Sequence, residues 1–192
     1  MKTKVLLYCV GLFIILTNCE TSTFQYVMSS SRSLDYTVDH TGRFTENNEI
    51  AASELNADLE LPEDAIVRGV YIEALSISTE TLSENEADEI ILDGWIIADE
   101  TVQFLEGFVI PIEPGESDFI KLGNLVANGI LSISENLESF ILEGVPSSVG
   151  FRLEGNSYPE TGENIHLNIS IDITMSVTYE LESEVPWFIQ GS

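Results

Sequence analysis

The sequence has very few basic residues: seven Lys and Arg stand against 33 Asp and Glu in 192 residues. The resulting formal charge of −26 repels nucleic acid and anionic lipid headgroups, so the composition argues against both as partners. Solubility, or life in salty water, explains such acidity, because salt screens the self-repulsion. Disorder is not indicated, since 44% hydrophobic residues is normal for a packed domain.

Histidine and cysteine are also scarce, with two of each. His40 and His166 have no further ligand residue at metal-binding spacing, which argues against a zinc or iron site. The Gly-x-Ser-x-Gly elbow of serine hydrolases and the glycine-rich phosphate loops are absent from the sequence. We therefore assign no catalytic residue. A pair of carboxylates of the kind that glycosidases use stays open, because 33 acids supply many pairs.

The N-terminus has the pattern of an export signal. A short basic start precedes an apolar run, residues 5–16, that is too short to span a bilayer as a helix. The run ends in Leu16-Thr17-Asn18-Cys19. This ending resembles the lipobox of bacterial lipoproteins, in which the signal is cut before a cysteine that becomes diacylated, although Asn18 replaces the small residue usual there. The alternative is an ordinary signal peptide in which Cys19 occurs by chance.

The resemblance implies that an acyl chain such as palmitate on Cys19 anchors the mature protein to a membrane. The resemblance also implies a location in the cell envelope, with the outer membrane of a Gram-negative bacterium as the preferred site. We expect a signal peptide over residues 1–18, a lipidated N-terminus and polar tether over 19–32, and a single β-rich domain over 33–192. For the tether, a short edge strand around Phe24, Tyr26 and Val27 is the second interpretation.

The strongest pattern in the chain is the alternation over residues 165–181. Every odd position is apolar and every even position is polar, which is typical of a strand with one buried and one wet face. Such a segment spans roughly 56 Å at about 3.3 Å per residue, much longer than an average strand. We expect it to bend or to carry a bulge, and to form the spine of a sheet.

Other segments also have strand patterns. Residues 66–78 change their apolar face partway, which predicts a β-bulge or, alternatively, a strand with both faces covered, as under a packed helix. Residues 90–98 and 102–112 form a predicted hairpin around Asp99-Glu100. Residues 149–153 alternate before a loop that contains Gly and Pro, so we expect them to pair with the spine strand.

Two segments have helical spacing instead. Residues 119–142 carry apolar side chains every three or four positions, with a break expected near Gly129 and a capped restart at Ser132. Residues 49–59 form a shorter predicted helix. Together the patterns predict a mainly β fold, an antiparallel β-sandwich with one or two packed helices. The alternative is an α+β fold with a helix across one sheet.

An acidic loop over residues 80–89 is the one candidate for a cofactor site. Glu84, Glu86 and Asp88 offer the oxygen ligands that calcium prefers. Their spacing does not match an EF-hand, so a solvated loop without cofactor is the simpler interpretation.

Aromatic residues outside the strands are the candidates for a contact surface. Tyr158 lies in a loop, and Trp187 and Phe188 lie in the C-terminal tail, so we predict that these three bind a glycan or an envelope protein partner. Tyr71 and Trp95 lie in strongly apolar strands, and we expect them in the core.

Three classes of function follow from these observations. The first is a lipid-anchored bacterial cell-envelope protein with a non-catalytic structural or protein-interaction role. The second is a glycan-binding lipoprotein serving uptake at the outer membrane, which an exposed row of coplanar aromatics would favour. The third is a carboxylate-dependent hydrolase, which a deep pocket with two facing carboxylates would favour.

The charge balance makes a prediction about salt. If Lys2 and Lys4 leave with the signal, five basic residues remain against 33 acidic ones, a formal charge of −28. We expect the thermal midpoint of the mature protein to rise from about 0.01 to about 0.5 M NaCl, because the Debye length falls from about 30 Å at the lower concentration to a few Å. Circular dichroism measures it. A flat midpoint contradicts the prediction, and a rise seen only with calcium points to the acidic loop.

Overall fold

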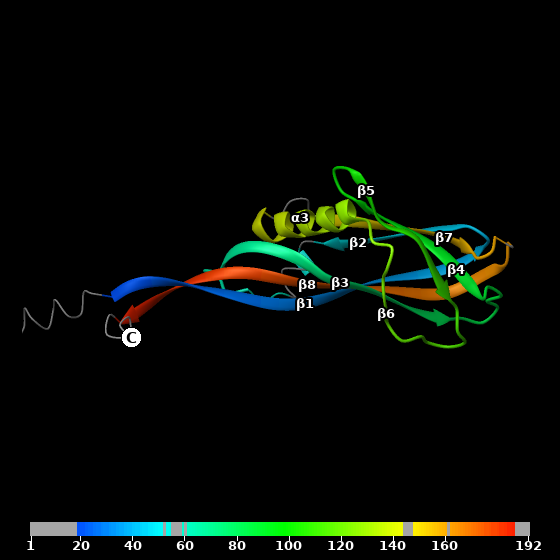
Figure 1. The fold of residues 1–192 in the computed structure, drawn as a ribbon, viewed down its shortest axis with the longest axis horizontal. Helices are drawn as coiled ribbons and strands as arrows, with labels where there is room; N and C mark the ends of the chain where they lie inside the picture. Colours follow the sequence, from blue (N-terminus) through cyan, green and yellow to red (C-terminus); the bar gives the residue numbers. More distant parts are fainter. Residues whose placement is uncertain are drawn as a thin grey trace, which may run out of the picture.

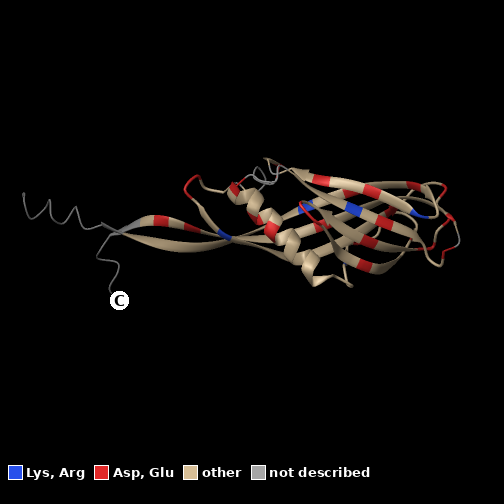
Figure 2. Cartoon of the chain, turned by 90° about the horizontal axis from the view of Figure 1, so that it is seen from above, with Lys and Arg blue, Asp and Glu red and all other residues tan. Residues whose placement is uncertain are grey.

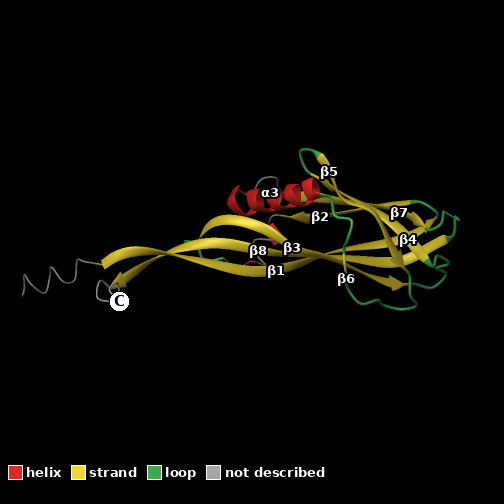
Figure 3. Cartoon of the chain, viewed as in Figure 1, coloured by secondary structure: helices red, strands yellow, loops and turns green. Residues whose placement is uncertain are grey.

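The structure is a computed structural model that describes residues 19–51, 53–54, 59, 61–143, 148–160 and 162–186. Two four-stranded antiparallel sheets face each other, and the helix α3 (Ala127–Glu143) packs against both of them (Figures 1 and 3). The predicted mainly β antiparallel sandwich with a packed helix is therefore confirmed. Within the described residues, no helix is long and apolar enough to cross a bilayer.

The first sheet has the order β1-β8-β3-β6. Its strands are β1 (Cys19–Thr41), β8 (Asn164–Pro186), β3 (Ile66–Thr81) and β6 (Ile120–Lys121). Strand β8 lies between β1 and β3, so the spine prediction is confirmed. Its odd residues from Ile165 to Val177 are at most 1% exposed and line the inner face of this sheet, the face toward the core. The opposite face of the sheet is called its outer face below.

The predicted bulge in residues 66–78 is also confirmed. The pairing of β3 with β8 shifts between Val67 and Gly69, and again between Ile72 and Ala74. The register between β8 and β1 has no such shift over its whole length. The bulge that we expected in the long spine strand therefore lies in its neighbour β3, at these two register shifts.

The second sheet has the order β2-β7-β4-β5, formed by β2 (Phe44–Ala51), β7 (Ser148–Ser157), β4 (Glu89–Ile97) and β5 (Thr101–Pro111). The predicted hairpin is confirmed as β4 and β5, and the amide of Ala98 donates to the Glu100 carbonyl over 3.2 Å in its turn. The predicted pairing of residues 149–153 with the spine strand is wrong. Strand β7 pairs with β2 and β4, because the loop after Ser157 crosses from one sheet to the other.

The helical predictions are only partly right. Residues 119–126 are not helical, since β6 pairs with β3 there and the Leu122 amide donates to the Leu75 carbonyl over 2.8 Å. Helix α3 then runs from residue 127 to 143 without the expected break and restart. Of the predicted helix over 49–59, residues 49–51 belong to β2 and residues 53, 54 and 59 are helical, while 52 and 55–58 lie outside the described residues.

The predicted tether is strand as well. Residues 20–32 belong to β1, which pairs with β8 from its first residue and passes through residues 32 and 33 without interruption. The second interpretation, an edge strand around Phe24, is therefore the right one. Polar Ser and Thr side chains alternate with apolar ones in this segment. The apolar residues Phe24 and Tyr26 pair with Leu181 and Tyr179 of β8.

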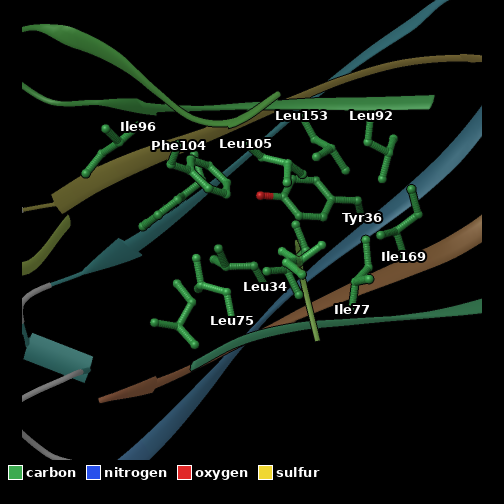
Figure 4. Close-up of a cluster of buried hydrophobic side chains, with 14 of the residues drawn as sticks. Leu34, Tyr36, Leu75, Ile77, Leu92, Ile96, Phe104, Leu105, Leu153 and Ile169 are labelled. Atoms are coloured by element: carbon green, nitrogen blue, oxygen red, sulfur yellow. The ribbon is translucent and has the colours of Figure 1, made fainter. Parts of the chain in front are cut away.

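The core lies between the inner faces of the two sheets. Figure 4 shows Tyr36, Ile77 and Ile169 of the first sheet facing Leu92 and Leu153 of the second. Burial raises the pKa of the Tyr36 phenol, so this side chain stays neutral in the apolar interior. The two aromatics that the sequence predicts in the core are not there.

Those two aromatics lie on the outer faces of the sheets. Tyr71 is 60% exposed, and Trp95 is half-buried beneath the guanidinium of Arg152, 4.9 Å from the ring centroid. Strand β4 alternates strictly between buried and half-buried positions, so its apolar residues on both faces do not mean that both faces are covered.

The first turn of α3 makes a prediction about Gly129. A Cβ at this position would lie 2.2 Å from the carbonyl oxygen of Gln103 and 2.4 Å from Cα of Phe104, both backbone atoms of β5. We expect Gly129→Ala to lower the free energy of unfolding by about 1–3 kcal/mol despite alanine's better helix propensity, because helix and strand must separate. Urea denaturation measures the loss.

Gly123 provides the matched control. A Cβ there meets only the ring of Phe108, at an ordinary 3.7 Å. Gly123→Ala should therefore change the free energy of unfolding by less than about 0.5 kcal/mol. Equal effects of the two substitutions would contradict the close approach of α3 to β5.

Candidate functional site

The most distinctive feature of the molecule is a two-stranded projection at one end. Cys19–Tyr26 of β1 pairs with Tyr179–Pro186 of β8, and Figure 1 shows these segments extending beyond the sandwich. We call this projection the ribbon. Strand β3 joins the ladder only from Ile66, opposite Glu180, so the outermost part of the ribbon has no third strand. Both ends of the described chain meet at its tip, because Cys19 pairs with Pro186.

The ribbon continues the inner and outer faces of the first sheet. Even positions of β1 face the core at Leu34, Tyr36 and Val38, and the register to β8 is unbroken, so Phe24 and Tyr26 belong to the inner face. Each is 43% exposed, since the second sheet does not reach this far. The outer face of the ribbon instead carries polar residues such as Thr23 opposite Glu182.

Aromatic stacking organises the inner face at the base of the ribbon. The rings of Tyr26 and Tyr179 stack with centroids 5.5 Å apart and an interplanar angle of 21°. Across the next strand, Val67 pairs with Tyr179 and packs on the edge of the core. On the outer face, Arg68 forms an ion pair with Glu180 at 2.7 Å. Apolar and charged side chains are thus separated onto opposite faces.

A groove of about 510 Å³ lies at the base of the ribbon, beside Val67. It is lined by apolar residues from the loop before β3, the start of β3 and the end of α3: Leu61, Pro62, Ala65, Ile66, Val67, Ile141 and Leu142. Val67 thus lines the groove and pairs with Tyr179 at the base of the ribbon.

The structure places the predicted lipidation residue at the end of the ribbon. Cys19 is the first residue of β1, opposite Pro186. The predicted contact residues Trp187 and Phe188 lie outside the described residues, and in the sequence they directly follow Pro186. The third one, Tyr158, is 47% exposed and lies in the loop after β7, where its amide donates to the Glu89 carbonyl over 2.9 Å.

Tyr158 is at the other end of the sandwich from the ribbon, in the loop that precedes β8 (Figure 1). The structure therefore places Tyr158 at the opposite end of the molecule from the described residues Cys19 and Pro186.

The acidic loop is held in place by hydrogen bonds to the start of β8. The Asn164 amide donates to the Glu86 carboxylate over 3.2 Å, and its side chain donates to the Glu84 carbonyl over 2.8 Å. Asp88 contributes a backbone carbonyl to the Ile112 amide. Within the described ranges, no three His, Cys, Asp or Glu side chains gather closely enough to hold a metal ion, so the predicted calcium ligands do not form a cluster.

One hollow of about 220 Å³ on the outer face of the second sheet contains carboxylates. Asp93 of β4 and Glu154 of β7 stand directly opposite each other there. Asp93 accepts hydrogen bonds from the Gly107 amide at 2.8 Å and from the Gln103 side chain at 3.3 Å, and Glu154 forms an ion pair with Arg152 at 3.2 Å. Both carboxylates are thus held by structural partners within this hollow.

Acidic residues cover the remainder of the molecule. Figure 2 shows Asp and Glu distributed over both sheets and the loops at the end opposite the ribbon, with few Lys and Arg among them.

The sequence did not make a strand the first interpretation of the ribbon segment of β1. The polar residues Ser30 and Arg32 interrupt the apolar alternation between this segment and the buried residues of β1 that follow. The signal was present, since Phe24, Tyr26 and Met28 share the even phase of the core residues that follow.

No family model matches the sequence, and no curated protein matches it either. Several solved structures of viral proteins have a partly similar arrangement. Desmodium yellow mottle tymovirus is 11% identical over 83% of this chain and 90% of that chain, with a TM-score of 0.34. Turnip yellow mosaic virus (11%, 83% and 85%, 0.28) and the decameric BFDV capsid protein (9%, 81% and 99%, 0.35) are comparable. Similarity at this level carries no argument about function.

Proposed function

We propose that this chain is a lipid-anchored protein of the bacterial cell envelope with a non-catalytic structural or protein-interaction role. Its anchor is an acyl chain on Cys19, and its location is the outer membrane of a Gram-negative bacterium. The sequence contributes the export signal and the lipobox-like ending at Cys19.

The position of Cys19 in the fold is the observation that carries the proposal. This residue begins β1 at the tip of the ribbon, away from the sandwich. The eight paired residues on each strand of the ribbon extend over about 26 Å, at about 3.3 Å per residue, and so separate the anchor from the sandwich.

The same geometry supports a role in presentation. A paired ribbon is stiffer than a flexible tether, so the sandwich keeps a defined orientation relative to its anchor. The end opposite the ribbon carries the loop 82–88 and the described loop residues 158–160 and 162–163. The first loop is tied to β8 by backbone hydrogen bonds such as that from the Glu86 amide to the Asn164 carbonyl at 2.9 Å. These acidic loops lie at the end of the molecule farthest from the anchor, where a partner can reach them.

Acylation is tested by the cysteine substitutions that the sequence offers. We expect Cys19→Ser to abolish metabolic labelling with palmitate and to release the protein from the membrane fraction. Cys9→Ser is the matched control, because Cys9 lies in the expected signal peptide and its loss should leave labelling unchanged. Equal labelling of the two variants would refute the anchor at Cys19.

The non-catalytic role is tested by a screen of the purified protein. We expect no turnover of chromogenic glycosides, esters or peptides, because Asp93 and Glu154 are held by Gly107 and Arg152 in an open hollow. Turnover that Asp93→Asn or Glu154→Gln abolishes would make the protein a hydrolase. On a glycan array, binding that Tyr158→Ala abolishes would favour the glycan-binding alternative instead.

A further inference from the structure

The inner face of the ribbon exposes apolar side chains that nothing in the described structure covers. Four of them form what we call the apolar strip, in which Phe24 pairs with Leu181 and Tyr26 with Tyr179. Phe24 and Tyr26 are each 43% exposed, and Tyr179 and Leu181 are half-buried. In a protein this acidic, an uncharged patch with two exposed aromatic side chains at one end points to a specific occupant.

We propose that the apolar strip lies on the bilayer interface, so that the ribbon rests along the membrane as a second contact beside the lipid on Cys19. This inference rests on the proposed function, because the acyl chain is what brings a bilayer to the ribbon. The partner is the interfacial layer of the membrane, where the headgroups meet the acyl chains.

Charge is distributed between the two faces as this orientation requires. Among the ribbon residues whose side chains the structure describes, none on the inner face is charged. The outer face carries two glutamates, Glu180 and Glu182. A charged face keeps its hydration in water and is repelled by anionic headgroups, so the ribbon has one side that suits lipid and one that does not.

The residue types also match the membrane interface. Tyrosine and tryptophan are enriched where headgroups meet the hydrocarbon region, and the strip contains two tyrosines and a phenylalanine. The strip thus brings interfacial residue types to the end of the molecule that carries the proposed anchor.

Reach determines how the ribbon must lie. Phe24 is five residues from Cys19, about 17 Å along an extended strand, whereas the interfacial layer is only about 5–8 Å thick on each side of the hydrocarbon region. A ribbon perpendicular to the membrane would hold Phe24 above this layer, so the strip contacts lipid only when the ribbon lies along the surface. Figure 1 shows β1 and β8 crossing each other beyond the sandwich, so the inner face of the ribbon turns away from its direction in the body.

Single-tryptophan variants of the acylated full chain test the proposal. In a Trp95→Phe, Trp187→Phe background, Phe24→Trp reports on the inner face and Thr23→Trp on the outer face. Thr23 is the matched control, because it is adjacent to Phe24, exposed, and one residue nearer the attachment point. Each protein is reconstituted into phosphatidylcholine vesicles with and without brominated acyl chains, and flotation verifies incorporation.

We expect brominated lipid to reduce the emission of the Phe24→Trp protein at least about twofold and to leave the Thr23→Trp protein nearly unchanged, since only the inner face contacts lipid. Equal quenching in both variants, or none in either, overturns the proposal while flotation still supports the anchor. Blue-shifted but unquenched emission at position 24 means that protein covers the strip, which also overturns it. Protein that fails to float overturns the anchor at Cys19 and this inference together.

Discussion

The whole structure depends on the pairing of β8 with β1. This register runs without a shift from Thr41 opposite Asn164 to Cys19 opposite Pro186. In the sandwich, the inner face of these two strands forms one side of the apolar core. On their outer face, side chains are joined by hydrogen bonds such as that from Ser33 Oγ to Asp172 at 2.7 Å. Beyond the second sheet the same ladder becomes the ribbon. One uninterrupted register therefore builds both the core and the projection.

The faces of the strands could be predicted from the sequence because side chains in a strand alternate with period two. The odd residues of β8 are buried as expected, and the change of face within residues 66–78 corresponds to the register shift between Ile72 and Ala74. These features are local: each strand shows in its own sequence which of its sides avoids water. The antiparallel sandwich follows from several such strands joined by short connections.

What could not be predicted was which elements meet in space. Alternation in β7 shows a buried face but does not name its neighbours, and β7 lies in the other sheet from β8. The helical spacing before residue 127 is real, yet pairing of Ile120 and Lys121 with β3 outweighs it. From the sequence, Gly129 predicts a break in the helix. In the fold, its missing Cβ allows α3 to approach the backbone of β5. In the candidate site, Cys19 could be recognised from its sequence motif. The apolar strip could not, because it depends on how far the pairing of β1 with β8 extends.

The unbroken ladder also has a mechanical consequence. With an anchor at Cys19 and a load at the opposite end of the sandwich, where β8 begins at Asn164, β1 and β8 are pulled in opposite directions along their own axes. Tension in this direction shears the ladder, so its hydrogen bonds share the force. Separation of Cys19 from Pro186 would instead peel the strands apart one pair at a time. The ladder therefore resists a pull on the far end of the molecule strongly. It is weak only against separation of the two strands at the tip.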